Sequence, residues 1–250
     1  MMLHLVEIPL IFPTGVHMNQ SMGSVFHGAL MEGIASEAAA QFHQQTMRPY
    51  SQCLYWNKET EQAVWRIGTL NDYAYEQIII PLQKAQALRL RSKGYAVQLG
   101  KMQSLRSVSP DELASQFIEA PKAPSAITWE SLSVISFKSH GKYIIWPDCR
   151  FLYQSLQNRW NFFNQEMHFE DAHFLDALSD ASLLTKYRLQ SKIFFLEKTA
   201  VPGCVGSIQC RLHGFDMLKR IAGLMASFAE FSGIGIKTAL GMGAVRTEII

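Results

Sequence analysis

The sequence predicts an α+β protein built from two tandem ferredoxin-like domains, each a split βαβ unit. Two observations lead to this prediction. The expected elements of the first half follow the order strand, helix, strand, strand, helix, strand, which is the signature of that fold. A segment with two prolines among small residues, 119–125, then separates them from a second set of similar elements. We therefore expect domains at residues 1–120 and 125–250, each of normal domain size.

The elements of the first domain follow from periodicity and from helix signals. Apolar residues alternate in the strands, whereas Phe26, Leu30 and Ile34 recur at helical spacing in a segment rich in helix formers. Asn71 can cap a second helix, and Pro81 predicts a kink or an early end in it. The expected elements are a strand at 3–10, a helix at 21–45, strands at 53–56 and 63–69, a helix at 71–86, and extended segments at 88–92 and 95–106.

The second domain contains the same kinds of element, without any residue-level repeat of the first. His140 and Gly141 form the turn of an expected hairpin, and a helical segment begins at Asp148. The expected elements are strands at 132–138 and 142–146, helices at 148–165 and 171–178, strands at 182–197 and 205–213, a helix at 215–231, and a last strand at 243–250. The repeat is therefore one of architecture.

The composition excludes several classes of protein. With 48% hydrophobic and 18% charged residues, disorder, collagen and coiled coil are ruled out. The four cysteines form no C-x-x-C pair and are interpreted as free, buried thiols in a reducing compartment. Residues 1–12 include Glu7 and lack a cationic start, which indicates a strand and not a signal peptide. The longest other apolar run, 221–229, has about half the length needed to cross a bilayer. We expect a cytoplasmic protein with no membrane partner.

The formal charge of +2 hides an uneven distribution along the chain. Residues 84–106 contain six basic and no acidic side chains, and residues 186–250 contain nine basic and four acidic ones. The stretch 166–180 is acidic and has no Lys or Arg. If the basic segments meet in the fold, they form a groove for a phosphate backbone despite the nearly neutral total. Ordinary solvated faces are the equally weighted alternative.

Four glycines stand within eleven residues between the last expected helix and the last strand. The segment reads Gly233-Ile-Gly235-Ile-Lys237-Thr-Ala-Leu-Gly241-Met-Gly243. Glycines permit positive φ and close backbone approach, so exposed N–H groups together with Lys237 are suited to an anion. A dinucleotide fingerprint lacks its third glycine here, and a Walker loop is interrupted by Ile236. A purely structural turn packed on the helix is the alternative.

This glycine loop resembles the hallmark loop of the RAMP superfamily of CRISPR-associated RNA-binding proteins. Within the superfamily the chain is similar to the repeat-processing endoribonucleases, the sixth-numbered Cas proteins, in the form that accompanies type III systems. The resemblance rests on the loop and on the stretches 23–31, 135–138 and 143–148, and it extends from about residue 20 to the end. It implies tandem ferredoxin-like domains, CRISPR repeat RNA as the partner, and association with a type III interference complex as a further partner.

The resemblance also implies the chemistry. The family cleaves RNA without a metal: a ribose 2′-hydroxyl attacks the adjacent phosphate and leaves a 2′,3′-cyclic phosphate and a 5′-hydroxyl. Such a reaction needs a base, an acid and a cation, and histidine suits the first two roles because its ordinary pKa lies near neutral pH. By analogy with the family, His43 is the first candidate for proton transfer, His27 the second, and Arg48 the candidate cation, whereas the family often has a lysine nearby. Tyr50 and His17 are lesser candidates.

Geometry sets a condition on a site with two histidines. In one straight helix over 21–45, His27 and His43 would lie about 24 Å apart along the axis and about 160° apart around it. They could not share a phosphate in that case. A break near residues 33–36, with Ser36 capping a second short helix, would let the chain fold back. The two-histidine site is therefore predicted only if the helix breaks there.

RNA is expected to lie over a basic surface contributed by residues 186–246. The predicted RNA-binding residues are Gly233, Gly235, Lys237, Gly241, Gly243, Arg188 and Lys192. No cofactor and no metal are predicted, and the chain is expected to be a monomer or a homodimer. A RAMP subunit that binds RNA in an interference complex without cutting it is the alternative function. A small-molecule enzyme that binds a nucleotide phosphate is excluded by the glycine spacing.

Overall fold

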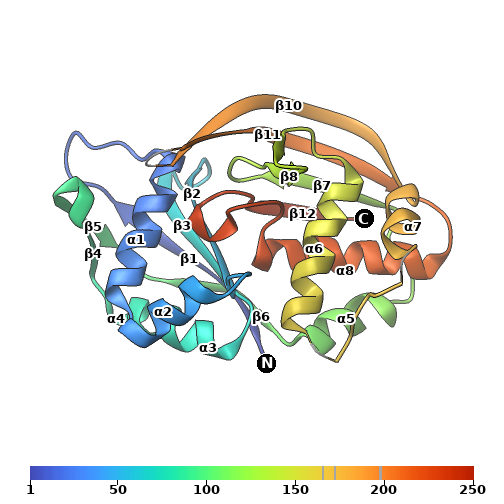
Figure 1. Ribbon diagram of the computed structural model, residues 1–250, viewed down its shortest axis with the longest axis horizontal. Helices are drawn as coiled ribbons and strands as arrows, with labels where there is room; N and C mark the ends of the chain where they lie inside the picture. Colours follow the sequence, from blue (N-terminus) through green and yellow to red (C-terminus); the bar gives the residue numbers. More distant parts are fainter. Residues whose placement is uncertain (165, 172, 197–198) are drawn as a thin grey trace.

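The computed structural model describes residues 1–164, 166–171, 173–196 and 199–250. Two antiparallel sheets lie side by side, one from each half of the chain, and helices cover them (Figure 1). The prediction of two tandem ferredoxin-like units is confirmed by this strand order and by the related structures reported below. Positions 165, 172 and 197, which were included in the expected helices and the expected strand at 182–197, lie outside the described residues. No described helix combines the length and the apolar character that crossing a membrane requires.

The N-terminal sheet is antiparallel, and β1 lies at its centre. Its order is β2-β3-β1, after which β6 and the hairpin β4–β5 pair with different parts of β1. The strands are β1 (Leu3–Ile11), β2 (Tyr50–Asn57), β3 (Gln62–Thr69), β4 (Ala87–Leu90), β5 (Tyr95–Leu99) and β6 (Gln103–Val108). The extended segment expected at 95–106 is thus two strands, because the chain must leave the hairpin before it can pair beside the start of β1.

The helix expected at 21–45 is two helices, and the break between them lies where the two-histidine site requires it. The segment begins after the short turn η1 (Gln20–Met22) as α1 (Gly23–Gly33), and α2 (Ser36–Gln44) follows in a new direction. Ile34 is extended, with φ −102° and ψ 168°, so the helical hydrogen bonds end there. The prediction that Ser36 caps α2 is wrong: Ala35 is the capping position and makes no side-chain bond, and Ser36 is the first helical residue.

The second helical segment of this half is irregular. The side chain of Asn71 caps it, as predicted, by accepting a hydrogen bond from the N–H of Ala74. A π-helical turn, η2 (Tyr75–Ile79), lies between α3 (Asp72–Ala74) and α4 (Ile80–Lys84). The wide turn comes directly before Pro81, which has no N–H to continue the regular helical pattern.

The C-terminal sheet has the order β10-β11-β7-β12. The strand predicted at 132–138 is confirmed only at its end, where Phe137 begins the first strand of the predicted hairpin around His140 and Gly141. The strand that pairs in the main sheet is β7 (Ala126–Ser131), and residues 132–136 leave the sheet after it. Of the residues that follow, Ile135 forms only an isolated bridge to Cys204. The small hairpin β8 (Phe137–Ser139) and β9 (Lys142–Ile144) then precedes α6 (Cys149–Phe163). The remaining elements are α7 (Phe174–Asp180), β10 (Ser182–Leu196), β11 (Thr199–Leu212), α8 (Asp216–Ser232), η4 (Thr238–Leu240) and β12 (Val245–Ile249).

One helix, α5 (Pro110–Ile118), was not predicted. Its signal is present in the sequence, because Ser109 and Glu112 form a capping box in which each side chain binds the other residue's backbone N–H. Leu113 and Ala114 of α5 belong to the same apolar core as the residues of α8. This core also contains Leu3 of β1, so apolar packing joins the two halves.

Close contacts between α8 and the N-terminal sheet hold the halves together. A Cβ on Gly68 of β3 would clash with the carbonyl oxygen of Phe231, and the Ser51 hydroxyl donates to the same carbonyl at 2.6 Å. Buried Arg66 bonds Glu7 at 3.1 Å within the N-terminal sheet and lies 4.0 Å from Glu230 of α8. The catalytic candidates on one half are therefore held in a defined position relative to the glycine loop on the other.

Candidate active site

The break between α1 and α2 brings His27 and His43 together. Their ring centroids are 6.1 Å apart and the ring planes are nearly perpendicular, at 84°. The His27 ring is buried, whereas His43 is exposed on the last turn of α2. The geometric condition for a two-histidine site is met, since the rings are now close enough to reach one phosphate group.

A buried aromatic residue anchors each histidine. Phe26 and Phe42, which precede His27 and His43 in the sequence, are both 0% exposed. Phe26 packs edge-on against Trp65 of β3, and Phe42 packs against the Tyr50 ring of β2. Because both anchors hold their helices on the same sheet, the neighbouring histidines are directed to a common site.

Tyr50 is part of the site. Its hydroxyl lies 2.8 Å from Nδ1 of His27, and burial raises the pKa of the phenol well above its usual value. Burial, followed by the positive charges of Arg48 and His43, lowers the pKa of His27 to about 4. The phenol therefore keeps its proton and donates it in the hydrogen bond, while the neutral imidazole of His27 carries its own proton on Nε2.

Arg48, the predicted cation, lies in the segment between α2 and β2. Its positive charge contributes to the lowered pKa of His27 and opposes the rise in the pKa of Tyr50. Arg48 also borders a cavity of about 340 Å³ that Lys138 and Lys237 line as well. The Nε of Arg48 is buried and bonds no atom of the described residues.

The glycines of the loop at 233–243 permit close packing of the backbone. All four have positive φ, and a Cβ on Gly235 or Gly243 would clash with a backbone carbonyl oxygen. The expectation of a row of exposed N–H groups is wrong for Gly235, Ile236 and Gly243. These N–H groups donate to Ser155 Oγ, the Ser136 carbonyl and the Val134 carbonyl at 2.9–3.0 Å. Packing therefore accounts for the glycine spacing, and direct contact with RNA remains a prediction.

The loop is docked against the helix that carries His27. A Cβ on Gly23, at the start of α1, would come within 2.7 Å of the Gly241 Cα. The Gln52 side chain ties the two segments together by donating to the Gly23 carbonyl at 2.7 Å and to the Ala239 carbonyl at 3.0 Å. The indole of Trp65 orients that amide through a 2.9 Å bond to its oxygen. The loop and His27 are thus positioned by one hydrogen-bonded network.

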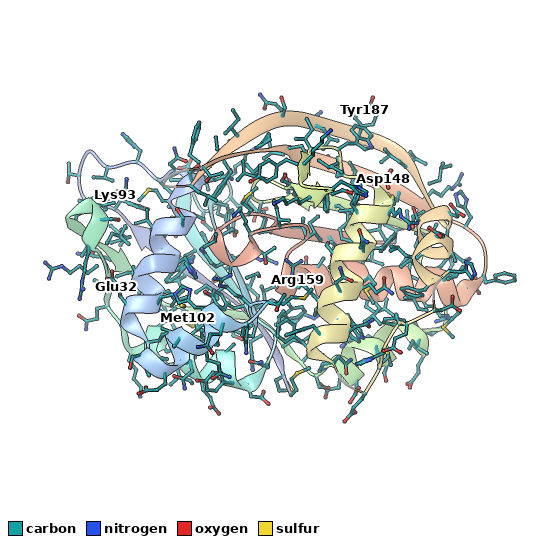
Figure 2. The ribbon with its side chains drawn as sticks, in the orientation of Figure 1. Glu32, Lys93, Met102, Asp148, Arg159 and Tyr187 are labelled. Carbon is teal, nitrogen blue, oxygen red and sulfur yellow. The ribbon has the colours of Figure 1, made fainter. Side chains whose placement is uncertain are left out.

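Arg159 of α6 supports the loop from its other side and was not predicted. Its guanidinium donates to the Gly235 carbonyl at 2.9 Å and to Thr238 Oγ1 at 3.2 Å. Burial lowers its pKa to about 10, which leaves it charged at neutral pH. Figure 2 shows Arg159 on the side of α6 nearer the centre of the molecule. In the sequence, Arg159 is only a basic residue within an expected helix, and nothing there indicates that it bonds the glycine loop.

The basic side chains predicted to bind RNA do not form one continuous surface patch. The hairpin β10–β11 arches across both halves (Figure 1), and Lys192 near its tip bonds Gln20 of η1 at 3.1 Å. Arg188 is exposed on β10, and Lys237 lies at the cavity rim in a left-handed conformation. Arg246, included in the expected basic surface, instead lies 5.2 Å above the Tyr55 ring and bonds its hydroxyl.

Comparisons with known proteins agree with this fold. A family model described as CRISPR-associated endoribonuclease Cas6 matches residues 130–245. The chain is 30% identical over 236 residues to the Cas6 endoribonuclease of Streptococcus thermophilus, covering 93% of each chain. It is 31% identical over 230 residues to that of Mycobacterium tuberculosis, covering 91% of this chain and 72% of the relative.

Solved structures show the same fold. A Cas6 product complex matches with a TM-score of 0.80 at 20% identity, over 99% of this chain and 100% of the other. Thermus thermophilus Cas6 matches with a TM-score of 0.73 at 21% identity, over 99% and 98% of the two chains. The sequence relationship extends over nearly the whole chain, and the chain belongs to the family of CRISPR-associated endoribonucleases named Cas6.

Proposed function

We propose that this protein cuts CRISPR precursor RNA once within each repeat, by attack of a ribose 2′-hydroxyl on the adjacent phosphate and without a metal ion. The observation that supports this most directly is the pair of imidazoles, whose ring centroids are 6.1 Å apart, together with the positive charge of half-buried Arg48. The transesterification requires proton transfer from the 2′-hydroxyl and to the departing 5′-oxygen, together with a hydrogen-bond donor and a cation that offset the negative charge on the phosphate. The products would carry a 2′,3′-cyclic phosphate and a 5′-hydroxyl.

The environments of the two histidines suggest different roles. His43 is exposed at the end of α2, where it can exchange protons with solvent and with the RNA. We assign it both proton transfers: it accepts the proton of the attacking 2′-hydroxyl and returns a proton to the departing 5′-oxygen. His27, with a pKa of about 4, is a weak base at neutral pH, and its Nε2–H is suited to donating a hydrogen bond to a phosphate oxygen. Arg48 supplies the positive charge that offsets the extra negative charge of the transition state.

RNA is proposed to reach this site along β10 and the glycine loop. Lys192 of β10 lies beside η1, and Lys237 lies at the cavity rim. Solved relatives include a product complex and a substrate mimic complex of Cas6. A RAMP subunit that only binds RNA would need the loop and these lysines, but it would not need the histidine pair. The pair therefore favours the nuclease over that alternative.

The test is cleavage of end-labelled repeat RNA in excess EDTA. The expected result is one cut whose upstream product ends in a cyclic phosphate. His43→Gln should lower the cleavage rate at least about 100-fold, since a positioned proton-transfer group contributes roughly 10²–10⁴. Its RNA affinity should stay within about threefold, since the exposed ring is assigned to proton transfer and not to binding.

His213→Gln, a change at an exposed histidine after β11, is the matched control and should leave both values unchanged. RNA that is bound but never cut would favour the non-catalytic alternative. Equal loss of cutting and binding in His43→Gln would show that His43 has a structural or binding role.

A further inference from the structure

The cavity beside the candidate active site has features that the cleavage chemistry does not use. It has a volume of about 340 Å³ and lies between residues 46–48, one face of α6 and the end of the glycine loop. Its size falls within the range of roughly 300–1,000 Å³ that is typical of small-ligand sites. The cavity begins at residue 46, two residues after the end of α2, whose last turn carries His43, and the charge of Arg48 in its lining acts on His27. A ligand in the cavity would therefore lie near the histidine pair.

The charge of the cavity favours an anion. Among the residues that the structure describes, four cationic side chains and no carboxylate line the cavity. Arg159 is committed to the carbonyls of the glycine loop, which leaves Arg48, Lys138 and Lys237 for a ligand. Phe151 also lines the cavity and stacks on Phe137 at 5.8 Å, which adds an aromatic wall. Phosphate and an aromatic base are the two parts of a ligand that such a lining would bind.

Two free amides on α6 provide polar recognition. The helix carries two pairs of amide side chains. Gln157 and Asn161 donate to the Phe169 carbonyl at 2.6 and 3.0 Å and so have a structural role. Gln154 and Asn158, one turn apart, are exposed, line the cavity, and make no hydrogen bond within the described part of the chain. Each offers a donor and an acceptor, which is the combination that recognises the edge of a nucleobase.

We infer that this cavity receives one unpaired nucleotide of the RNA, next to the cleaved bond, and that Gln154 and Asn158 read its base. This inference rests on the proposed function and adds a source of sequence preference to it. The cations at the rim hold the phosphate of that nucleotide and position it, while the amides distinguish one base from another. Removing the amides should therefore change which RNA is cut much more than how fast RNA is cut.

The experiment uses a pool of hairpin RNAs in which five consecutive unpaired nucleotides next to the stem are randomised. The pool is incubated with excess protein, and both the cleaved molecules and those retained on a filter are sequenced. The wild type should prefer one base at a position adjacent to the cut by at least about fivefold, as expected for an amide contact to a base edge. The double variant Gln154→Ala, Asn158→Ala should lose that preference while cutting the whole pool within about threefold of the wild-type rate.

Gln98→Ala, a change of an exposed amide on β5 that does not line the cavity, is the matched control and should keep the preference. An unchanged preference in the double variant would overturn the inference, as would a wild type that cuts with no preference next to the scissile bond. In both cases cleavage itself would still support the proposed function.

If the wild type retains RNA without cutting it, the nuclease proposal fails. The inference is then tested by the retained RNAs: a base preference that the wild type shows and the double variant lacks would support it, and equal preferences would overturn it. A wild type that neither cuts nor retains the pool would overturn both.

Discussion

Protonation of His27 should make the stability of the protein depend on pH. Its pKa is about 4 in the folded protein, against an ordinary histidine value of 6.5. Between these values the unfolded chain binds the proton and the folded chain does not, so the free energy of unfolding falls as pH is lowered. The loss begins near pH 6.5 and is complete near pH 4. Above pH 6.5 both states are neutral at this residue, and its contribution is constant.

The size of the effect follows from the two pKa values. A difference from 6.5 to about 4 corresponds to about 3 kcal/mol in total, at about 1.4 kcal/mol for each pH unit. Between pH 7 and pH 5 the expected loss from His27 is about 2 kcal/mol. This value is large compared with the total stability of a typical domain, roughly 5–15 kcal/mol. It should be measurable by urea unfolding followed through tryptophan fluorescence.

The perturbation is His27→Gln, which keeps a polar side chain beside the Tyr50 hydroxyl but cannot be protonated in this range. Unfolding is measured at pH 7, 6 and 5 for the wild type, for His27→Gln and for His213→Gln, the exposed control. The variant will differ in absolute stability, so the quantity compared is the change between pH 7 and pH 5. That change should be about 2 kcal/mol smaller in His27→Gln than in the other two proteins. Identical pH dependence in all three would refute a buried, neutral His27.

Two further predictions concern packing and RNA binding. Gly68→Ala should lower the free energy of unfolding by about 1–3 kcal/mol, because its Cβ would clash with the Phe231 carbonyl. Gly28→Ala, whose Cβ meets no atom within 4 Å, should not be destabilising, and equal losses would refute the close packing of the halves. Alanines at Lys192 and Lys237 should weaken RNA binding and reduce the slope of log affinity against log salt by about 1.4, since each contact to single-stranded RNA contributes about 0.7. An unchanged slope in a filter-binding titration would remove both lysines from the RNA path.

The sequence predicted helices and their ends well where the residues that determine them lie within one short segment. Asn71 caps the second helix as expected, and the break after α1 lies at the residues where the two-histidine site required one. The prediction of strands failed where pairing with other strands determines which residues are extended. Residues 126–131 form a strand because β11 and β12 pair with them on both sides, whereas the more apolar 132–136 leave the sheet. The missed α5 is an exception, since its capping box at Ser109 was readable.

The sequence by itself determined the family resemblance, the two-unit order of elements and the candidate residues His27, His43 and Arg48. The resemblance and the choice of these residues depend on residue type and position in the chain, and both can be read directly from the sequence. Only the tertiary structure decided that Tyr50 bonds His27, that Arg159 supports the glycine loop, and that Arg246 bonds Tyr55. These outcomes depend on contacts between residues far apart in the chain. The direction of a side chain and the pKa of a buried group depend on which distant elements pack around it, and one-dimensional spacing does not contain that information.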